Sequence, residues 1–240
     1  MSEQEPTVTV DPRVQRAGAL IASAEERGLP LALLGGAAVA TLCSSARGAG
    51  QYARALGDID FASTGKAKPA VDRFLLESGL EPDDEFNRMN GYIRLRYFDE
   101  DGSHVDVFLD ELRLCHLIRW RKTLALGEPT LPIHLLLLTK LQVVELEAKD
   151  ISDLSALLTD RWADILGGRD QLLGTVRDDW GLWRTGRGTL EALTRVPDPV
   201  VAGRATDLLG AWLIPRFSPR AKVRSLIGDK VRWYELPEEV

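Results

Sequence analysis

The chain has 240 residues, of which 45% are apolar, 28% charged and 7% aromatic, and its formal net charge is −6. This composition excludes collagen-like, low-complexity and strongly disordered classes, and the length suffices for one large domain or two small ones. The chain has 30 Lys and Arg against 36 Asp and Glu, so it has no overall excess of basic residues that could bind the phosphates of duplex nucleic acid. We therefore expect no duplex DNA partner.

Cysteine usage and hydropathy predict where the protein resides. The chain has two cysteines, Cys43 and Cys115, and Met1–Pro12 is polar and acidic, unlike a secretory signal. The longest apolar run, Leu131–Leu138, contains a proline and a histidine and falls well short of the roughly 20 residues of a membrane span. We therefore expect a reduced, cytoplasmic protein without a membrane partner.

The first part of the chain alternates between helical and extended patterns. Apolar residues at helical spacing predict a helix over Arg13–Gly28, and the short apolar run Leu31–Leu34 suits a buried strand. A helix opening at the next glycines is expected to continue through Ala37–Ser44. Strict alternation in Asp58–Ala62 predicts a second strand, and Ala67–Ser78 reads as a helix ended by glycine.

A β-hairpin and a helical region are expected further along. Tyr92–Phe98 and Val105–Leu109 alternate apolar and polar residues, and Asp99–Gly102 supplies turn chemistry between them. Helical patterns dominate beyond about residue 112: Ile133–Leu146, Ile151–Leu158, Arg161–Leu166, Arg169–Trp183 and Val200–Ile214. We predict an α/β (α+β) core with a mixed sheet in residues 1–112, followed by an all-helical C-terminal region in residues 113–240.

Three aspartates in these strands indicate a metal site. Side chains alternate across a strand, so Asp58 and Asp60 point to one side, and Asp106 lies opposite its apolar neighbours. If these strands share a sheet, the three carboxylates meet on its open face and repel one another. Hard oxygen ligands suit Mg²⁺, and carboxylates can bridge two such ions.

A glycine pair next to the first strand indicates phosphate binding. Gly35 and Gly36 open a helix, where backbone N–H groups are exposed and the helix dipole favours an anion. The absence of a Cβ lets a phosphate approach closely. With two metal ions nearby, these residues are typical of phosphoryl chemistry on a triphosphate.

At these motifs the chain resembles the nucleotidyltransferase superfamily, the fold of DNA polymerase β and tRNA CCA-adding enzymes. The resemblance depends on Gly35-Gly36 after a strand, Arg54 ahead of Asp58-Ile59-Asp60, and His104–Phe108. It covers roughly residues 30 to 160.

Two further segments are similar to the nucleotidyltransferases grouped with abortive-infection type IV toxins. They are Leu138–Leu141 and Lys149–Leu154. A member of that group would act as a bacterial toxin with a cognate antitoxin as partner.

The resemblance implies a role for each candidate residue. Asp58 and Asp60 would bind both Mg²⁺ ions, and Asp106 would bind one and accept a proton as general base. The residues implied in binding the nucleoside triphosphate are Gly35, Gly36, Arg54, Lys140, Lys149 and Asp150. The implied enzyme moves a nucleoside monophosphate from an NTP to a hydroxyl of RNA, protein or a small molecule, and pyrophosphate leaves.

Some residues depart from the family pattern or have a second interpretation. The family often has glycine-serine where this chain has two glycines, and a hydroxyl residue at the position of Leu56. Arg94 and Arg96 share the face of the aspartates, where they either neutralise them or bind the acceptor or pyrophosphate. A catalytically silent nucleotide-binding or partner-binding module with the same fold is therefore the alternative.

Two groups of residues have two possible roles each. Lys140 and Lys149 either contact phosphate or pair with Asp150 and Asp153. Tryptophans of the helical half are interleaved with arginines, and they form either core or a stacking surface for single-stranded RNA.

Overall fold

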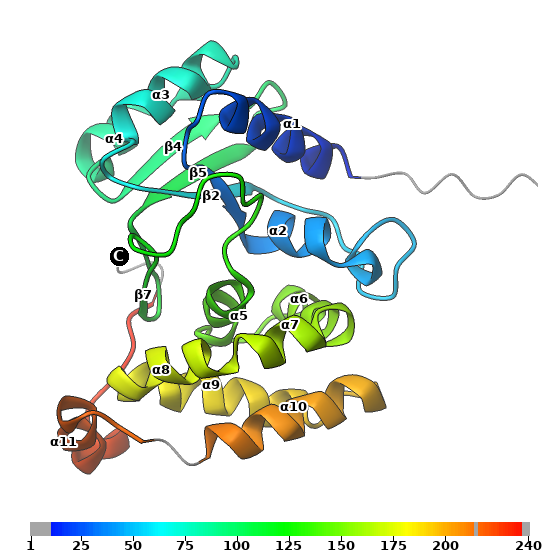
Figure 1. Cartoon of the computed structure of the whole chain (residues 1–240), viewed down its shortest axis with the longest axis vertical. Coiled ribbons are helices and arrows are strands. Elements are labelled where there is room, and N and C mark those ends of the chain that lie inside the picture. The colour runs from blue at the N-terminus through cyan, green and yellow to red at the C-terminus, as the bar shows by residue number, and fades with distance from the viewer. Residues whose placement is uncertain (1–10, 214–215, 237–240) are drawn as a thin grey trace, which may run out of the picture.

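The computed structural model describes residues 11–213 and 216–236. A five-stranded mixed sheet lies between helices α1 and α3 at one end of the molecule and a layer of C-terminal helices at the other (Figure 1). The prediction of an α/β core with a mixed sheet, followed by a helical region, is therefore confirmed at this level.

The order of strands in the sheet is β1-β2-β5-β4-β3. Strand β1 (Ala32–Leu34) runs antiparallel to β2 (Ile59–Ser63), and β2 runs parallel to β5 (His104–Leu109). Strand β4 (Arg94–Phe98) is the antiparallel hairpin partner of β5, and β3 (Glu81–Pro82) extends the edge. The predicted hairpin is confirmed, and the central parallel pair places β2 beside β5.

One face of this sheet is fully apolar. The alternating residues on the central strands are at most 2% exposed: Ile59, Phe61, Leu95, Tyr97, Val105 and Val107. Helix α3 (Lys68–Glu77) covers this face, and the Tyr97 hydroxyl donates a hydrogen bond to Asp72 on α3 over 2.6 Å. Because side chains alternate, the intervening polar residues must point to the opposite face.

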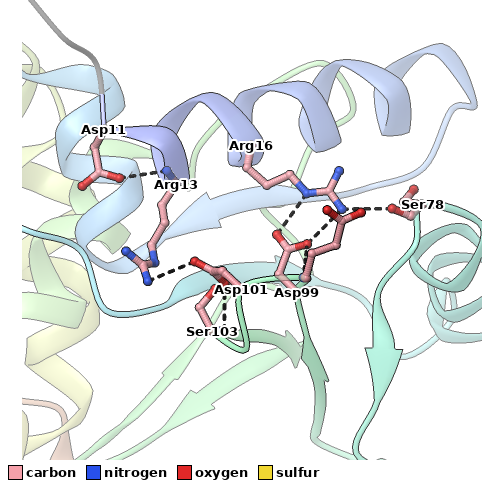
Figure 2. A network of polar contacts seen from close by, with 8 residues as sticks. Asp11, Arg13, Arg16, Ser78, Asp99, Asp101 and Ser103 are labelled. Carbon is pink, nitrogen blue, oxygen red and sulfur yellow. Dashed lines mark hydrogen bonds and ion pairs between the residues drawn. The ribbon is translucent and has the colours of Figure 1, made fainter.

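Helix α1 (Pro12–Glu26) lies across the β4–β5 turn, as Figure 2 shows. Arg13 pairs with Asp101 over 3.3 Å, and Arg16 pairs with Asp99 over 3.0 Å. The apolar side of α1 is buried in the main core, so these ion pairs orient the helix more than they stabilise it.

Short elements connect the strands. Helix α2 (Gly35–Leu42) follows β1 directly, and the 3₁₀ turn η1 (Ser44–Ala46) follows α2. Helix α4 (Asp84–Asn90) was not predicted, although Asp83 caps it by accepting a hydrogen bond from the Phe86 N–H.

The C-terminal region is helical except at its start. A short antiparallel hairpin, β6 (Glu111–Arg113) with β7 (Leu117–Arg119), precedes the helices and was not predicted. The helices that follow are α5 (Ile133–Leu141), α6 (Ala148–Asp160), α7 (Trp162–Gly167), α8 (Arg169–Asp178), α9 (Trp180–Leu193), α10 (Pro199–Trp212), α11 (Pro219–Ile227) and the 3₁₀ turn η2 (Gly228–Lys230).

Residues beyond 112 also bind the sheet. The Leu33 N–H donates to the Pro129 carbonyl, and the Leu131 N–H donates back to the Leu33 carbonyl. The Trp120 indole N–H donates to the Ser63 carbonyl over 2.9 Å. The domain boundary at residue 112 stays a prediction.

No helix in the two described ranges combines the length and apolar character needed to cross a membrane. Cys43 and Cys115 are both buried free thiols.

Candidate active site

Two of the predicted metal ligands are neighbours on the open face of the sheet. Asp60 of β2 and Asp106 of β5 are partners in the parallel register. Asp60 is half-buried and Asp106 is 3% exposed, whereas Asp58 precedes β2 and is exposed. The parallel pairing therefore brings two carboxylates together, with the third at the end of the strand.

Asp106 is neutralised by two arginines of β4. Arg94 donates to both carboxylate oxygens, over 3.0 Å from Nε and 2.6 Å from a terminal nitrogen. Arg96 adds a hydrogen bond from Nε over 3.2 Å. Of the two interpretations of these arginines, neutralisation of an aspartate is thus observed.

Aromatic rings hold the two guanidinium groups in place. The Arg96 guanidinium lies 4.1 Å from the centre of the Phe86 ring on α4. The Arg94 guanidinium lies 4.8 Å from the Phe108 ring and 5.4 Å from the Phe86 ring. Such cation–π contacts strengthen where water is excluded, and both side chains are largely covered, with 28% of Arg94 and 23% of Arg96 exposed.

Asp60 has the opposite environment. No side chain or N–H group within residues 11–213 and 216–236 forms a hydrogen bond or ion pair with its carboxylate. Burial, and next the charge of Asp106, raise the pKa of Asp60 to about 6, against the opposing charges of Lys140 and Arg94. A carboxylate in this state gains from any cation that reaches it.

The two glycines make room for charged side chains. Gly35 has φ +68°, and a Cβ there would overlap the Asp60 carboxylate. At Gly36 a Cβ would overlap the Arg54 guanidinium. Helix α2 has no side-chain cap, so its first N–H groups, beside Asp60, remain available to an anion.

Arg54 forms an ion pair with Asp153 on α6. It donates two hydrogen bonds to Asp153, each over 2.8 Å, and Asp153 is 3% exposed. Burial raises the pKa of Asp153, but the hydrogen bonds from Arg54 and the charge of Lys140 outweigh burial and hold that pKa below its ordinary value. Arg54 lies outside the cavity that contains Asp60. The role of Arg54 in triphosphate binding stays a prediction, because its guanidinium lies against Gly36 at the start of α2 but does not line the cavity.

Lys140 connects this ion pair to Asp60. Its ammonium nitrogen lies 2.6 Å from Asp153, so one of the two interpretations of Lys140, an ion pair with Asp153, is observed. Its charge also acts on Asp60. Lys140 is on α5 and lines the same cavity as Asp60, where it can turn toward an anion.

Asp150 and Lys149 lie at the start of α6. The Asp150 carboxylate accepts a hydrogen bond from the Glu147 N–H over 3.2 Å and completes a capping box, so its first role is to begin the helix. Lys149 pairs with Glu147 over 2.9 Å on the surface, rather than with Asp150. Both residues also line the cavity of Asp60.

This cavity has a volume of about 360 Å³ and is lined by two groups of elements. The first group is formed by β2, α2, α5 and the start of α6, which contact one another, and its charged lining residues, together with a glycine, are here called the charged end: Gly35, Asp60, Lys140, Glu145, Glu147, Lys149 and Asp150. The second group is formed by β5, the β6–β7 hairpin, one residue just after the end of α5 and residue 236, and its lining residues are here called the apolar end: Phe108, Leu112, Leu114, Cys115, Val143 and Leu236. Arg94 lies between the two groups, because it binds Asp106 and contacts the ring of Phe108. The volume falls in the range of roughly 300–1,000 Å³ that is usual for small-molecule sites.

The residues around Asp60 fit a metal ion only in part. No three His, Cys, Asp or Glu side chains are grouped to hold a metal in the part of the chain that the structure describes. Asp60 has the chemistry of a hard ligand without a protein partner among the described residues, and Asp58 is exposed nearby. Asp106 fits a cation only after Arg94 leaves it, because two guanidinium groups would repel the ion.

Sequence reasoning missed half of this site. Apart from Phe108 on the predicted strand β5, the apolar lining comes from the β6–β7 hairpin, from the loop after α5 and from Leu236, which is far along the chain. Strands of three residues are too short to show alternation. No pattern in the sequence signals that Leu236 returns to the sheet.

No protein-family model matches the chain, and no curated protein matches it at a significant level.

Proposed function

We propose that the protein is a Mg²⁺-dependent nucleotidyltransferase that moves a nucleoside monophosphate from an NTP to a hydroxyl of RNA, protein or a small molecule. The observation that carries this proposal is the pairing of Asp60 with Asp106 on parallel strands beside the uncapped start of α2. Carboxylates, backbone N–H groups and a lysine around one cavity suit a metal-bound polyphosphate.

The charged end of the cavity would hold the triphosphate. Gly35 brings the N–H groups of α2 close to Asp60, because a larger residue cannot occupy that position. Lys140 lies between Asp60 and Asp153 and would share its charge with a phosphate. Lys149 lines the same end and is exposed enough to leave Glu147.

Asp58 and Asp60 would hold Mg²⁺, and Asp106 would join them when Arg94 turns away. The metal would supply charge neutralisation at the phosphates and at the attacking oxygen. In the reaction the acceptor hydroxyl forms a bond to the α-phosphorus, the bond to the β-phosphate oxygen breaks, and pyrophosphate leaves. Asp106 can accept the hydroxyl proton only after Arg94 has left, since two guanidinium donors make a carboxylate a poor base.

The second candidate function is a catalytically silent nucleotide-binding or partner-binding module with the same fold. The ion pairs from Arg94 and Arg96 to Asp106 favour it, because they satisfy the carboxylate without a metal. The nucleotide-binding form of this module requires nucleotide in the cavity and differs from the enzyme only in turnover, whereas the partner-binding form requires no nucleotide.

Thermal unfolding with Mg²⁺ and each ribonucleoside triphosphate tests binding. We expect at least one nucleotide to raise the Tm of the wild-type protein and of Asp207→Ala, an exposed control on α10, but not of Asp60→Ala. No nucleotide-dependent change in the wild type would refute both the enzyme and the nucleotide-binding module, and would leave the partner-binding module.

Transfer of α-labelled nucleotide to RNA or protein then separates the enzyme from the silent module. We expect label on an acceptor with the wild type and none with Asp60→Ala. Binding without transfer to any acceptor would favour the silent module.

A further inference from the structure

The last described residues return to the candidate active site. After α11 and η2 the chain turns back toward the sheet, and residues 231–236, here called the C-terminal segment, reach the β6–β7 hairpin (Figure 1). Leu236 at the end of this segment lines the cavity that contains Asp60. The C-terminal segment thus contributes one wall of a cavity that the sheet also lines.

The C-terminal segment is anchored on α9 through Trp233. The Trp233 indole N–H donates to the Thr185 hydroxyl over 3.1 Å, and its ring packs edge-on against Trp180 at 5.9 Å. The Arg184 guanidinium lies 5.3 Å from the centre of the same ring. At Gly181 a Cβ would approach the Trp233 carbonyl to 2.8 Å, so the backbone of the segment lies directly against the helix.

Two further hydrogen bonds fix the segment on either side of Trp233. Arg224 of α11 donates to the Val231 carbonyl over 2.8 Å. The Glu235 N–H donates to the Cys115 carbonyl of the β6–β7 hairpin over 3.2 Å. Leu236 is therefore held beside the cavity at a defined place, which lowers the ordering cost of a contact with a ligand.

The two ends of the cavity match the two parts of a nucleoside triphosphate. The charged end suits the triphosphate, and the apolar end suits the flat faces of a base. Around that apolar end, Phe108 comes from β5, Leu114 and Cys115 come from the hairpin, Val143 follows α5, and Leu236 comes from the C-terminal segment.

We propose that the apolar end is the subsite for the nucleotide base and that the C-terminal segment forms one of its walls, with Leu236 in contact with the base. This inference rests on the proposed function. It makes the C-terminal segment a determinant of nucleotide binding, while the phosphates are bound by the sheet, α2 and α5.

Paired titrations of the full-length protein test the inference. The probes are the ribonucleoside triphosphate that binds the wild type most tightly and inorganic tripolyphosphate, both with Mg²⁺. In Leu236→Asp we expect the affinity for the nucleotide to fall at least about tenfold, because a carboxylate replaces an apolar contact. Affinity for tripolyphosphate should stay within about twofold of the wild type, because it uses only the charged end.

Val231→Asp is the matched control, because Val231 is 58% exposed, belongs to the same segment and does not line the cavity. It should bind both probes like the wild type. Leu236→Ala should show a smaller loss for the nucleotide alone, and it keeps the test valid if Leu236→Asp does not fold.

The outcomes separate this inference from the proposed function. An unchanged nucleotide affinity in both Leu236 variants, or an equal loss for both probes, would overturn the base subsite and leave the proposed function standing. Absence of binding of either probe to the wild type would overturn the proposed function, and the base subsite with it.

Discussion

Asp60 and Asp106 are register partners on parallel strands, yet only Asp106 is bound by guanidinium groups. One carboxylate is thus compensated within the fold, and the other is left with a raised pKa beside a cavity. An uncompensated, half-buried carboxylate raises the free energy of the folded state. Its environment therefore favours the binding of a cation at the expense of the stability of the fold.

Replacing Asp60 by asparagine should stabilise the protein at neutral pH. The folded pKa, about 6, lies above the ordinary 3.8, so the folded state binds the proton more tightly and stability falls as pH rises between these values. We expect Asp60→Asn to raise the free energy of unfolding by up to about 3 kcal/mol at pH 7, and the gain to vanish below about pH 4. Urea unfolding across this pH range measures it.

Asp58→Asn is the matched control for that experiment, since Asp58 is exposed. At pH 7 its free energy of unfolding should stay within about 0.5 kcal/mol of the wild type. A pH-independent effect of Asp60→Asn would show that its carboxylate is already compensated.

Removing Arg94 should expose Asp106 to cations. Arg94 binds both oxygens of Asp106 and lines the cavity, whereas Arg96 binds one oxygen and lies against Phe86. In Arg94→Gln we expect the Kd for Mn²⁺ without nucleotide to fall about tenfold, and in Arg96→Gln to change less, because Arg94 still covers Asp106. Equal effects of the two variants would mean that net charge alone governs metal binding.

The sequence contained enough information for the strands that carry the carboxylates. Alternation in Asp58–Ala62 and Val105–Leu109 predicts both strands and the side to which their aspartates point. The same alternation places Arg94 on the face of Asp106, and the structure confirms that these residues meet. Local periodicity was sufficient because each inference required only the side of the strand to which a side chain points.

Contacts between distant residues could not be predicted in this way. Arg54 pairs with Asp153, 99 residues away, and only the packing of α6 near α2 brings them together. The predicted helix over Arg169–Trp183 was wrong in its extent, because Asp179 caps a new helix by accepting from the Leu182 N–H. That cap was visible in the sequence, whereas the pairing of Arg54 was not.

Replacing Gly35 by alanine should destabilise the protein and abolish nucleotide binding. The φ of +68° strains any L-residue, and the new Cβ would overlap the Asp60 carboxylate. We expect a loss of at least about 2 kcal/mol in the free energy of unfolding. Gly18→Ala in α1 is the control, because nothing lies within 4 Å of its Cβ, and it should stabilise the protein by about 0.5–1 kcal/mol. A neutral Gly35→Ala would contradict the close approach to Asp60.

His116 should make the helical region sensitive to acid. Burial lowers the pKa of His116 to about 4, against the opposing charge of Asp179, and its ring nitrogen lies 2.8 Å from the Thr185 hydroxyl. The unfolded state therefore binds the proton more tightly, and stability falls as pH drops from about 6.5 to about 4, by up to about 3 kcal/mol. Because Thr185 also holds Trp233, Trp fluorescence should report release of the C-terminal segment in the same pH range. We expect His116→Gln to remove this part of the pH dependence, whereas an unchanged profile would show that other groups cause the acid sensitivity.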